Sequence, residues 1–195
     1  GTQAIDVVVP GLTFEGYALS GIGGAANLDN NGEDVHKTFV SQTAGAVYVA
    51  FMVKIDALVT GYFLHLGQAT IGTNFFTRVG IATGSSETSF KFSLSKTNQT
   101  ATQSSSDYII GSTYLVIAKY NIIDGESNDE VSLFVFDGVI PTDEPATATI
   151  PAFTATVADF SPGSIALRQY DANIDIKVDG IRIATSWADA VTAAF

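Results

Sequence analysis

Cysteine is absent from all 195 residues, and this absence removes several kinds of chemistry. Without a thiol the chain can form no disulfide, no thiolate zinc site and no iron–sulfur cluster, and it has no cysteine nucleophile. Long apolar runs are absent as well. Even residues 45–55 are shorter than the roughly 20 residues of a membrane-spanning helix, and their hydrophobicity alternates. We therefore expect no membrane insertion.

Basic residues are scarce, since 9 Lys and Arg stand against 20 Asp and Glu and give a formal net charge of −11. This charge repels phosphate backbones and anionic lipid headgroups, so neither nucleic acid nor a membrane surface is an expected partner. Disorder is excluded too, because 46% of the residues are hydrophobic and only 15% are charged. The length suits one undivided all-β sandwich, which predicts a single domain over residues 1–195.

What the sequence has in abundance is alternation of period two. In residues 45–55 the apolar face consists of Val47, Val49, Phe51, Val53 and Ile55. Residues 90–95 and 130–135 alternate in the same way, and the denser apolar run at 113–120 indicates a strand covered on both faces.

Polar clusters with turn chemistry separate these runs, at residues 28–34, 82–88, 96–107 and 124–129. No helical pattern is interleaved between the strands. This arrangement is typical of antiparallel sheets stacked face to face. Residues 141–153, which hold three of the five prolines, are expected to form an extended crossover within the domain.

Near the C-terminal end the alternation changes parity. Ile176 and Val178 share one face, whereas Ile181 and Ile183 share the other, which predicts a β-bulge at Gly180.

A helix is expected after this last strand. Ser186 and Asp189 have the spacing of an N-terminal capping box, and Trp187, Val191 and Phe195 recur at helical spacing. We therefore predict one short C-terminal helix packed on the sandwich.

Several segments together resemble a known family: GLTFEGY at 11–17, SGIGGAA at 20–26, GEDVHKTF at 32–39, VYVAFMVKI at 47–55, TYLVIAKY at 113–120, NDEVSLFVF at 128–136 and SIALRQYDANIDIKVDGIRIATSWADAV at 164–191. The chain looks like the laminin-G-like module of multidomain extracellular bacterial proteins that carry C-terminal secretion signals. The resemblance implies a concanavalin A-like jelly roll, an extracellular or cell-surface location with any signal peptide removed, and an accessory role without an assigned ligand.

No catalytic constellation is visible in the sequence. Hydrolases of this fold carry a Glu-x-Asp-x-x-Glu signature, which is absent, and paired carboxylates would be needed for glycoside hydrolysis. Asp175 and Asp179 come nearest to such a pair, but Lys177 lies between them and the bulge turns Asp179 away. Neither His36 nor His65 has a nucleophile nearby in sequence, and both are expected to be strand residues. We predict that the chain is not an enzyme.

Calcium is the only cofactor that the sequence favours, because two loops are rich in the oxygen ligands that this ion prefers. Their candidate ligands are Asp29, Asn31 and Asp34 in the first loop, with Asn30 and Glu33 beside them, and Asp124, Glu126, Asn128 and Asp129 in the second, followed by Glu130. Neither loop has the spacing of an EF-hand. Ordinary turns made by Asp and Asn side chains are the alternative interpretation.

Ligand binding is expected to involve aromatic side chains, since sugars are held by exposed rings together with planar polar groups. The candidates near strand ends or loops are Tyr17, Tyr62, Tyr108 and Tyr170. Exposed rings also occur wherever a sandwich cannot cover every side chain, so the pattern alone does not establish a binding site.

Three functions remain open, in this order: a recognition or adhesion module for a glycan or another surface ligand, a self-assembling surface or filament subunit, and a hydrolase. The second depends on the start of the chain, because related domains carry a further N-terminal edge strand. Two alternatives follow: either residues 5–9 fill that edge or the start of the chain was trimmed, or else a neighbouring subunit donates the strand.

Overall fold

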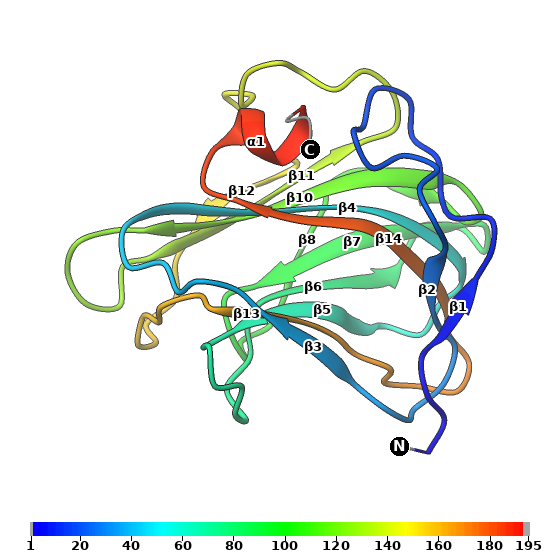
Figure 1. Cartoon of the computed structure of the whole chain (residues 1–195), viewed down its shortest axis with the longest axis horizontal. Helices are drawn as coiled ribbons and strands as arrows, with labels where there is room; N and C mark the ends of the chain where they lie inside the picture. Colours follow the sequence, from blue (N-terminus) through cyan, green and yellow to red (C-terminus); the bar gives the residue numbers. More distant parts are fainter. Residues whose placement is uncertain (1, 193–195) are drawn as a thin grey trace.

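The computed structural model describes residues 2–192 as two antiparallel seven-stranded sheets packed face to face (Figure 1). Sheet A consists of β1 (Asp6–Val8), β2 (Ala25–Leu28), β4 (Gly45–Ala57), β10 (Thr113–Ile122), β11 (Glu130–Phe136), β12 (Ile150–Phe153) and β14 (Asp175–Ala184). Sheet B consists of β3 (Val35–Thr38), β5 (Gly61–Gly67), β6 (Phe76–Thr83), β7 (Ser89–Ser95), β8 (Thr102–Gln103), β9 (Tyr108–Ile109) and β13 (Ser164–Leu167).

The strand order shows how distant parts of the chain become neighbours. In sheet A the order is β1-β2-β14-β4-β10-β11-β12, and in sheet B it is β3-β13-β5-β6-β7-β8, with β9 also paired to β7. The all-β sandwich predicted from the alternation is therefore confirmed. No helix within residues 2–192 is long and apolar enough to cross a membrane.

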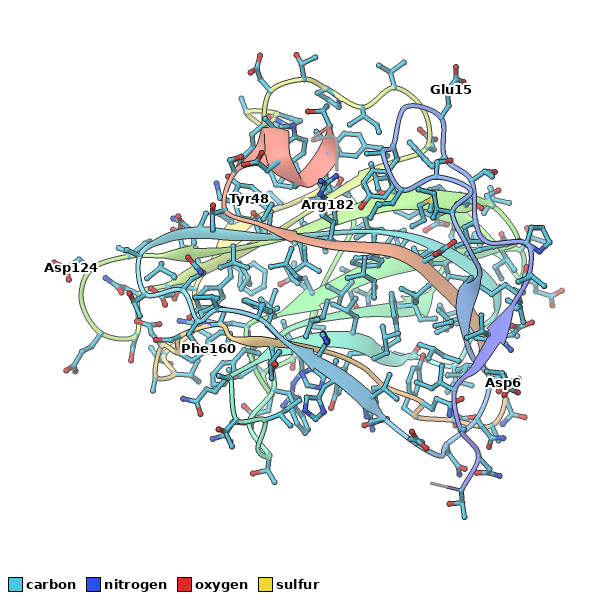
Figure 2. The ribbon with its side chains drawn as sticks, viewed as in Figure 1. Asp6, Glu15, Tyr48, Asp124, Phe160 and Arg182 are labelled. Atoms are coloured by element: carbon cyan, nitrogen blue, oxygen red, sulfur yellow. The ribbon has the colours of Figure 1, made fainter. Side chains whose placement is uncertain are left out.

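The main core lies between the two sheets. The predicted inward face of β4 is fully buried there, and Phe63 of β5 and Phe92 of β7 are equally buried on the opposite side. Each such side chain contributes roughly 1.5–3 kcal/mol relative to its exposed state. Phe160 also lies between the sheets (Figure 2), where its ring stacks on Phe76 at 3.8 Å between centroids.

Sheet A is covered on its outer face as well. Tyr48, Ala50 and Met52 of β4 are buried in a second apolar cluster under the 10–21 loop, the segment after β11 and the C-terminal helix (Figure 1). Figure 2 shows Tyr48 on this covered side. The prediction of both-sided burial is thus confirmed for β10, and it extends to β4.

The C-terminal helix α1 (Trp187–Val191) is present as predicted. The Ser186 side chain caps it by accepting a hydrogen bond of 3.1 Å from the Asp189 backbone N–H. Trp187 is buried, and its indole Nε1 donates to the Pro141 carbonyl at 3.0 Å. Phe195, the third residue of the predicted helical spacing, lies outside the described residues.

The bulge at Gly180 is confirmed. The pairing of β14 with β4 shifts register between Asp179 and Arg182, and Gly180 has φ +59°. A Cβ at this position would lie 3.0 Å from the Met52 methyl carbon and 3.1 Å from the Tyr17 ring. Glycine is therefore required there by both conformation and space.

The two edges of sheet A are formed by short strands. β1 pairs with β2, so the chain itself fills this edge, in agreement with the first of the two alternatives above. At the other edge, the expected crossover at 141–153 is irregular up to residue 149 and then forms β12, which pairs with β11.

The outer face of sheet B differs from that of sheet A. Within residues 2–192, apolar clusters form between the sheets and on the outside of sheet A, but none forms on the outside of sheet B. This uncovered face is where polar and aromatic side chains can meet a ligand.

Candidate ligand-binding surface

Small residues form the floor of the outer face of sheet B. Because side chains alternate along a strand and Val79 and Ile81 face the core, the neighbouring Gly80 and Ala82 of β6 face outward. In β7, Ser93 is outward for the same reason. A Cβ at Gly80 would lie 2.9 Å from the Ser93 Oγ, so the floor is tightly packed.

Tyr62, Arg78 and Arg168 stand on this floor, and Tyr170 lies at its margin, where its ring packs against the main core. Tyr62 belongs to β5, Arg78 to β6, and Arg168 and Tyr170 directly follow β13; all four are partly exposed. The Arg168 Cζ lies 4.4 Å from the centroid of the Tyr62 ring and 5.5 Å from that of Tyr170. The Arg78 Cζ lies 4.9 Å from the Tyr62 centroid. We call these four residues the Arg–Tyr surface.

Backbone contacts hold the Arg–Tyr surface in place. The Tyr170 hydroxyl donates to the Val59 carbonyl at 2.6 Å, and the Tyr170 ring lies so close to Gly61 that a Cβ there would overlap it. The Arg78 Nε donates to the Phe75 carbonyl at 3.1 Å, and the backbone N–H of Arg168 donates to Phe63 at 2.8 Å. The side chains are therefore oriented before any ligand arrives.

The electrostatics of this surface are cationic in an acidic chain. Among the described residues, no carboxylate lies within 4 Å of the guanidinium nitrogens of Arg78 or Arg168. Burial, together with the charge of Arg168, lowers the pKa of Arg78. Asp34 interacts electrostatically with Arg168. Burial raises the pKa of the Asp34 carboxyl, while the hydrogen bond from the Gln169 backbone N–H and the charge of Arg168 lower it.

His65 lies in the floor beneath these side chains. It is 2% exposed, with Phe75 at 4.3 Å and Tyr62 at 6.0 Å between ring centroids. Burial, followed by the charges of Arg78 and Arg168, lowers the pKa of His65 to about 4. The ring is therefore neutral at pH 7. The prediction that both histidines are strand residues is confirmed, since His36 lies in β3 and His65 in β5.

A hollow of about 280 Å³ adjoins the surface at Arg78. Besides Arg78, its walls include Asn74 and Phe75 before β6 and Asn98 after β7. A planar ring beside amide and guanidinium groups provides both an apolar contact and hydrogen-bonding groups. The hollow and the Arg–Tyr surface share Arg78, so they adjoin each other at β6.

The four tyrosines predicted from the sequence do not form one site. Tyr62 lies on the outer face of sheet B, and Tyr170 borders it while packing against the main core. Tyr17 is buried on the other side of the molecule, where its hydroxyl donates to the Gly180 carbonyl at 2.7 Å. Tyr108 packs against core rings, with Phe92 at 4.8 Å between centroids.

Arg78 and Arg168 were not predicted as site residues from the sequence. Two signals were available: the chain has only three arginines, and Arg78 alternates with the core residues Val79 and Ile81.

The first acidic loop is held by hydrogen bonds to Asn27 of β2 and to Gln169 after β13. Asp29 accepts from the Asn27 amide at 2.9 Å, and its backbone N–H donates to the Gln169 side chain at 3.1 Å. Asp34 accepts from the Gln169 backbone N–H at 3.0 Å. Asn31 is exposed, and its N–H donates to the neighbouring Asn30.

The second acidic loop is divided between its tip and the core. Asp124 lies at the tip of the hairpin between β10 and β11 (Figure 2), and Glu126 is exposed beside it. Asp129 is 1% exposed, and its carboxylate accepts from the Tyr120 hydroxyl at 2.6 Å and from the Ile123 N–H at 2.7 Å. Asn128 donates to the Asp124 carbonyl at 2.9 Å.

These contacts do not assemble a metal centre from the predicted ligands. Within residues 2–192, no group of three or more His, Cys, Asp or Glu side chains is placed to hold a metal ion. Calcium binding stays a prediction, and melting experiments can test it.

The acidic pair at the last strand is occupied by internal partners. Asp175 accepts from Lys177 at 2.6 Å, and the same ammonium also contacts Asp56 at 2.9 Å. Asp179 is buried, where its carboxylate accepts from the Leu12 N–H at 2.7 Å. The two carboxylates therefore serve different parts of the fold.

Comparison with known proteins supports the fold. No protein-family model and no curated protein matches the chain. Among solved structures, the globular domain of T. cruzi calreticulin is similar, with 11% identity, a TM-score of 0.50, and coverage of 94% of this chain and 79% of that one. Congerin II with lactose and MES has 11% identity, a TM-score of 0.46, and coverage of 78% and 100%. An Alteromonas alginate lyase has 12% identity, a TM-score of 0.44, and coverage of 80% and 81%.

At 11% identity, the similarity to the calreticulin domain shows the fold and nothing more. The chain is a concanavalin A-like jelly-roll β-sandwich with one short C-terminal helix.

Proposed function

We propose that this domain is a non-catalytic recognition module that binds a glycan through the Arg–Tyr surface. The observation that carries the proposal is the convergence of Arg78 and Arg168 on the Tyr62 ring at the uncovered face of sheet B, beside a hollow of about 280 Å³. A sugar ring offers apolar C–H faces and a rim of hydroxyl groups. Aromatic rings suit the faces, whereas guanidinium and amide groups suit the hydroxyls.

The non-catalytic part of the proposal rests on the partners of the acidic and histidine side chains. A general acid or base must lie within hydrogen-bonding distance of the substrate, and the atom that donates or accepts the proton must be accessible to it. Asp129 and Asp179 are buried with hydrogen-bonded backbone or hydroxyl donors, and His65 is buried beneath Tyr62 and Phe75. The extracellular or cell-surface location is proposed on the laminin-G-like resemblance.

A glycan array followed by titration calorimetry tests the proposed function. Tyr62→Ala removes the ring that both guanidinium groups contact, so we expect at least a tenfold loss of affinity for any glycan that the array identifies. Val139→Ala is the control, because Val139 is 91% exposed and lies outside this surface. Glycan binding that survives Tyr62→Ala, or an array without any bound glycan, would contradict the proposal.

Self-assembly is a second candidate function, favoured by the β1 edge of sheet A. β1 hydrogen-bonds to β2 on one side, and Val7 and Val9 beside this edge are 71% and 78% exposed. An exposed apolar edge strand is a template for pairing with another chain. Light scattering of wild type and Val7→Lys would test it: assembly lost in the variant supports the edge, and a monomeric wild type at all concentrations excludes it.

A further inference from the structure

The lysines and the arginines of this chain differ in their ion pairing. Five lysines are paired with carboxylates within 4 Å, namely Lys54, Lys91, Lys96, Lys119 and Lys177. Arg78 and Arg168 have no such partner among the described residues, although carboxylates outnumber cations in the chain. Both approach the same Tyr62 ring, at 4.9 and 4.4 Å from its centroid. Two like charges on the same aromatic ring, without a carboxylate partner, favour the binding of an anion at this surface.

Most of the N–H donors of these guanidinium groups are not used by the protein. An arginine side chain carries five N–H donors in a planar fork. Arg78 uses its Nε for the Phe75 carbonyl, and Arg168 makes one contact of 3.5 Å to the Tyr62 carbonyl. Within residues 2–192 the remaining donors of both residues have no protein acceptor, so they are available to a ligand.

We propose that the Arg–Tyr surface selects glycans that carry a carboxylate, which Arg78 and Arg168 bind through their paired N–H donors. This inference rests on the proposed function and names its ligand class. A carboxylate is planar and matches the arginine fork with two parallel hydrogen bonds. The sugar ring that bears it lies beside Tyr62, and the hollow beside Arg78 receives a neighbouring sugar unit.

The net charge of −11 narrows this class further. A densely charged polyanion is repelled by the whole molecule, whereas one carboxylate on a sugar meets the local guanidinium groups within a few ångströms. At physiological salt the Debye length is about 8 Å, so the more distant acidic residues are largely screened from such a contact. We therefore expect sparse carboxylates to bind and nucleic acids and heavily sulfated chains to be excluded.

The test compares each acidic oligosaccharide with its neutral counterpart. The probes are oligosaccharides that carry galacturonate, glucuronate or N-acetylneuraminate, their methyl esters, and a sulfated oligosaccharide, each titrated by calorimetry into the full chain. For at least one pair we expect the acid to bind ten or more times more tightly than its ester. Preference for the sulfated probe over every carboxylate would overturn the choice of carboxylate.

Matched variants locate the effect on the surface. Arg78→Gln and Arg168→Gln should each abolish the preference for acid over ester, and Arg168→Lys, which keeps the charge but lacks the fork, should retain only part of it. Lys37→Gln is the control, because it removes an exposed cation of β3 that has no ion-pair partner within residues 2–192. Thermal melting of each variant verifies folding.

The failures of the two proposals are distinguishable. Glycans that bind with equal affinity as acid and ester, and lose affinity with Tyr62→Ala, would refute the carboxylate inference and leave glycan recognition standing. An acid preference that survives both arginine variants would place the anion elsewhere and refute the inference. Absence of binding by every probe and by the glycan array would refute both.

Discussion

Replacing Asp159 with asparagine would leave a buried ammonium group without its counter-charge. The Lys96 side chain is fully buried, and its Nζ lies 2.6 Å from Asp159 Oδ1 and 3.3 Å from the Thr154 hydroxyl. Asp159 also accepts backbone N–H bonds from Asn128 at 3.0 Å and Asp129 at 3.1 Å. One carboxylate therefore joins the end of β7 to the hairpin between β10 and β11.

The expected cost of Asp159→Asn follows from this burial. Removing one partner of a buried ion pair destabilises a protein by about 3–5 kcal/mol. The asparagine oxygen still accepts one hydrogen bond, so we expect about 3 kcal/mol. Lys96→Met removes the buried charge itself and should cost less. Urea unfolding of both single variants and the double variant measures the coupling between the two residues.

The stability that Asp159 contributes should also depend on pH. Burial alone would raise the pKa of Asp159, but the hydrogen bonds from Lys96, Asn128 and Asp129 outweigh it and lower this pKa. The stabilisation is therefore present above the unfolded-state pKa and is lost as the pH falls through the folded-state pKa. A loss below 1 kcal/mol for Asp159→Asn at pH 7, or equal losses for both single variants without coupling, would refute this reasoning.

Three further predictions concern other parts of the fold. Because the pKa of His65 falls from 6.5 to about 4 on folding, the free energy of unfolding should decrease by roughly 3 kcal/mol as the pH is lowered from 6.5 to 4. Urea unfolding of His65→Gln should lack this pH dependence, and an equal pH dependence in His65→Gln and His36→Gln would contradict the prediction. Gly180→Ala should cost about 1–3 kcal/mol in urea unfolding because of its φ of +59° and its close neighbours, whereas Gly138→Ala, which meets open space, should cost little. If the acidic loops bind calcium, millimolar calcium after chelation raises the melting temperature; an unchanged temperature would favour turn chemistry alone.

Local signals in the sequence predicted the strands and their irregularities well. The alternation in residues 45–55, the parity change at Gly180 and the capping residue Ser186 each specify structure through neighbours a few residues away. The cover on sheet A was not predicted for β4. Tyr48 and Met52 are buried there by segments far away in sequence, and no local pattern encodes that contact.

The candidate site was only half predictable for the same reason. Arg78 and Arg168 are 90 positions apart and meet because β5 lies between β6 and β13 in sheet B. Proximity to loops suggested Tyr17 and Tyr108 as readily as Tyr62 and Tyr170. The direction in which each ring points depends on the register and on the covering segments, which the sequence pattern does not reveal.

The most direct test of ligand recognition by the Arg–Tyr surface is an NMR titration of the arginine Nε–Hε resonances. The chain contains only three arginines, so the spectrum should hold three such signals, and Arg182 on β14 of sheet A serves as an internal control (Figure 2). On addition of the carboxylate-bearing oligosaccharide that calorimetry identifies, the signals of Arg78 and Arg168 should shift together and saturate at the calorimetric affinity, while that of Arg182 stays in place. Unchanged Arg78 and Arg168 signals at saturating ligand would contradict recognition by this surface.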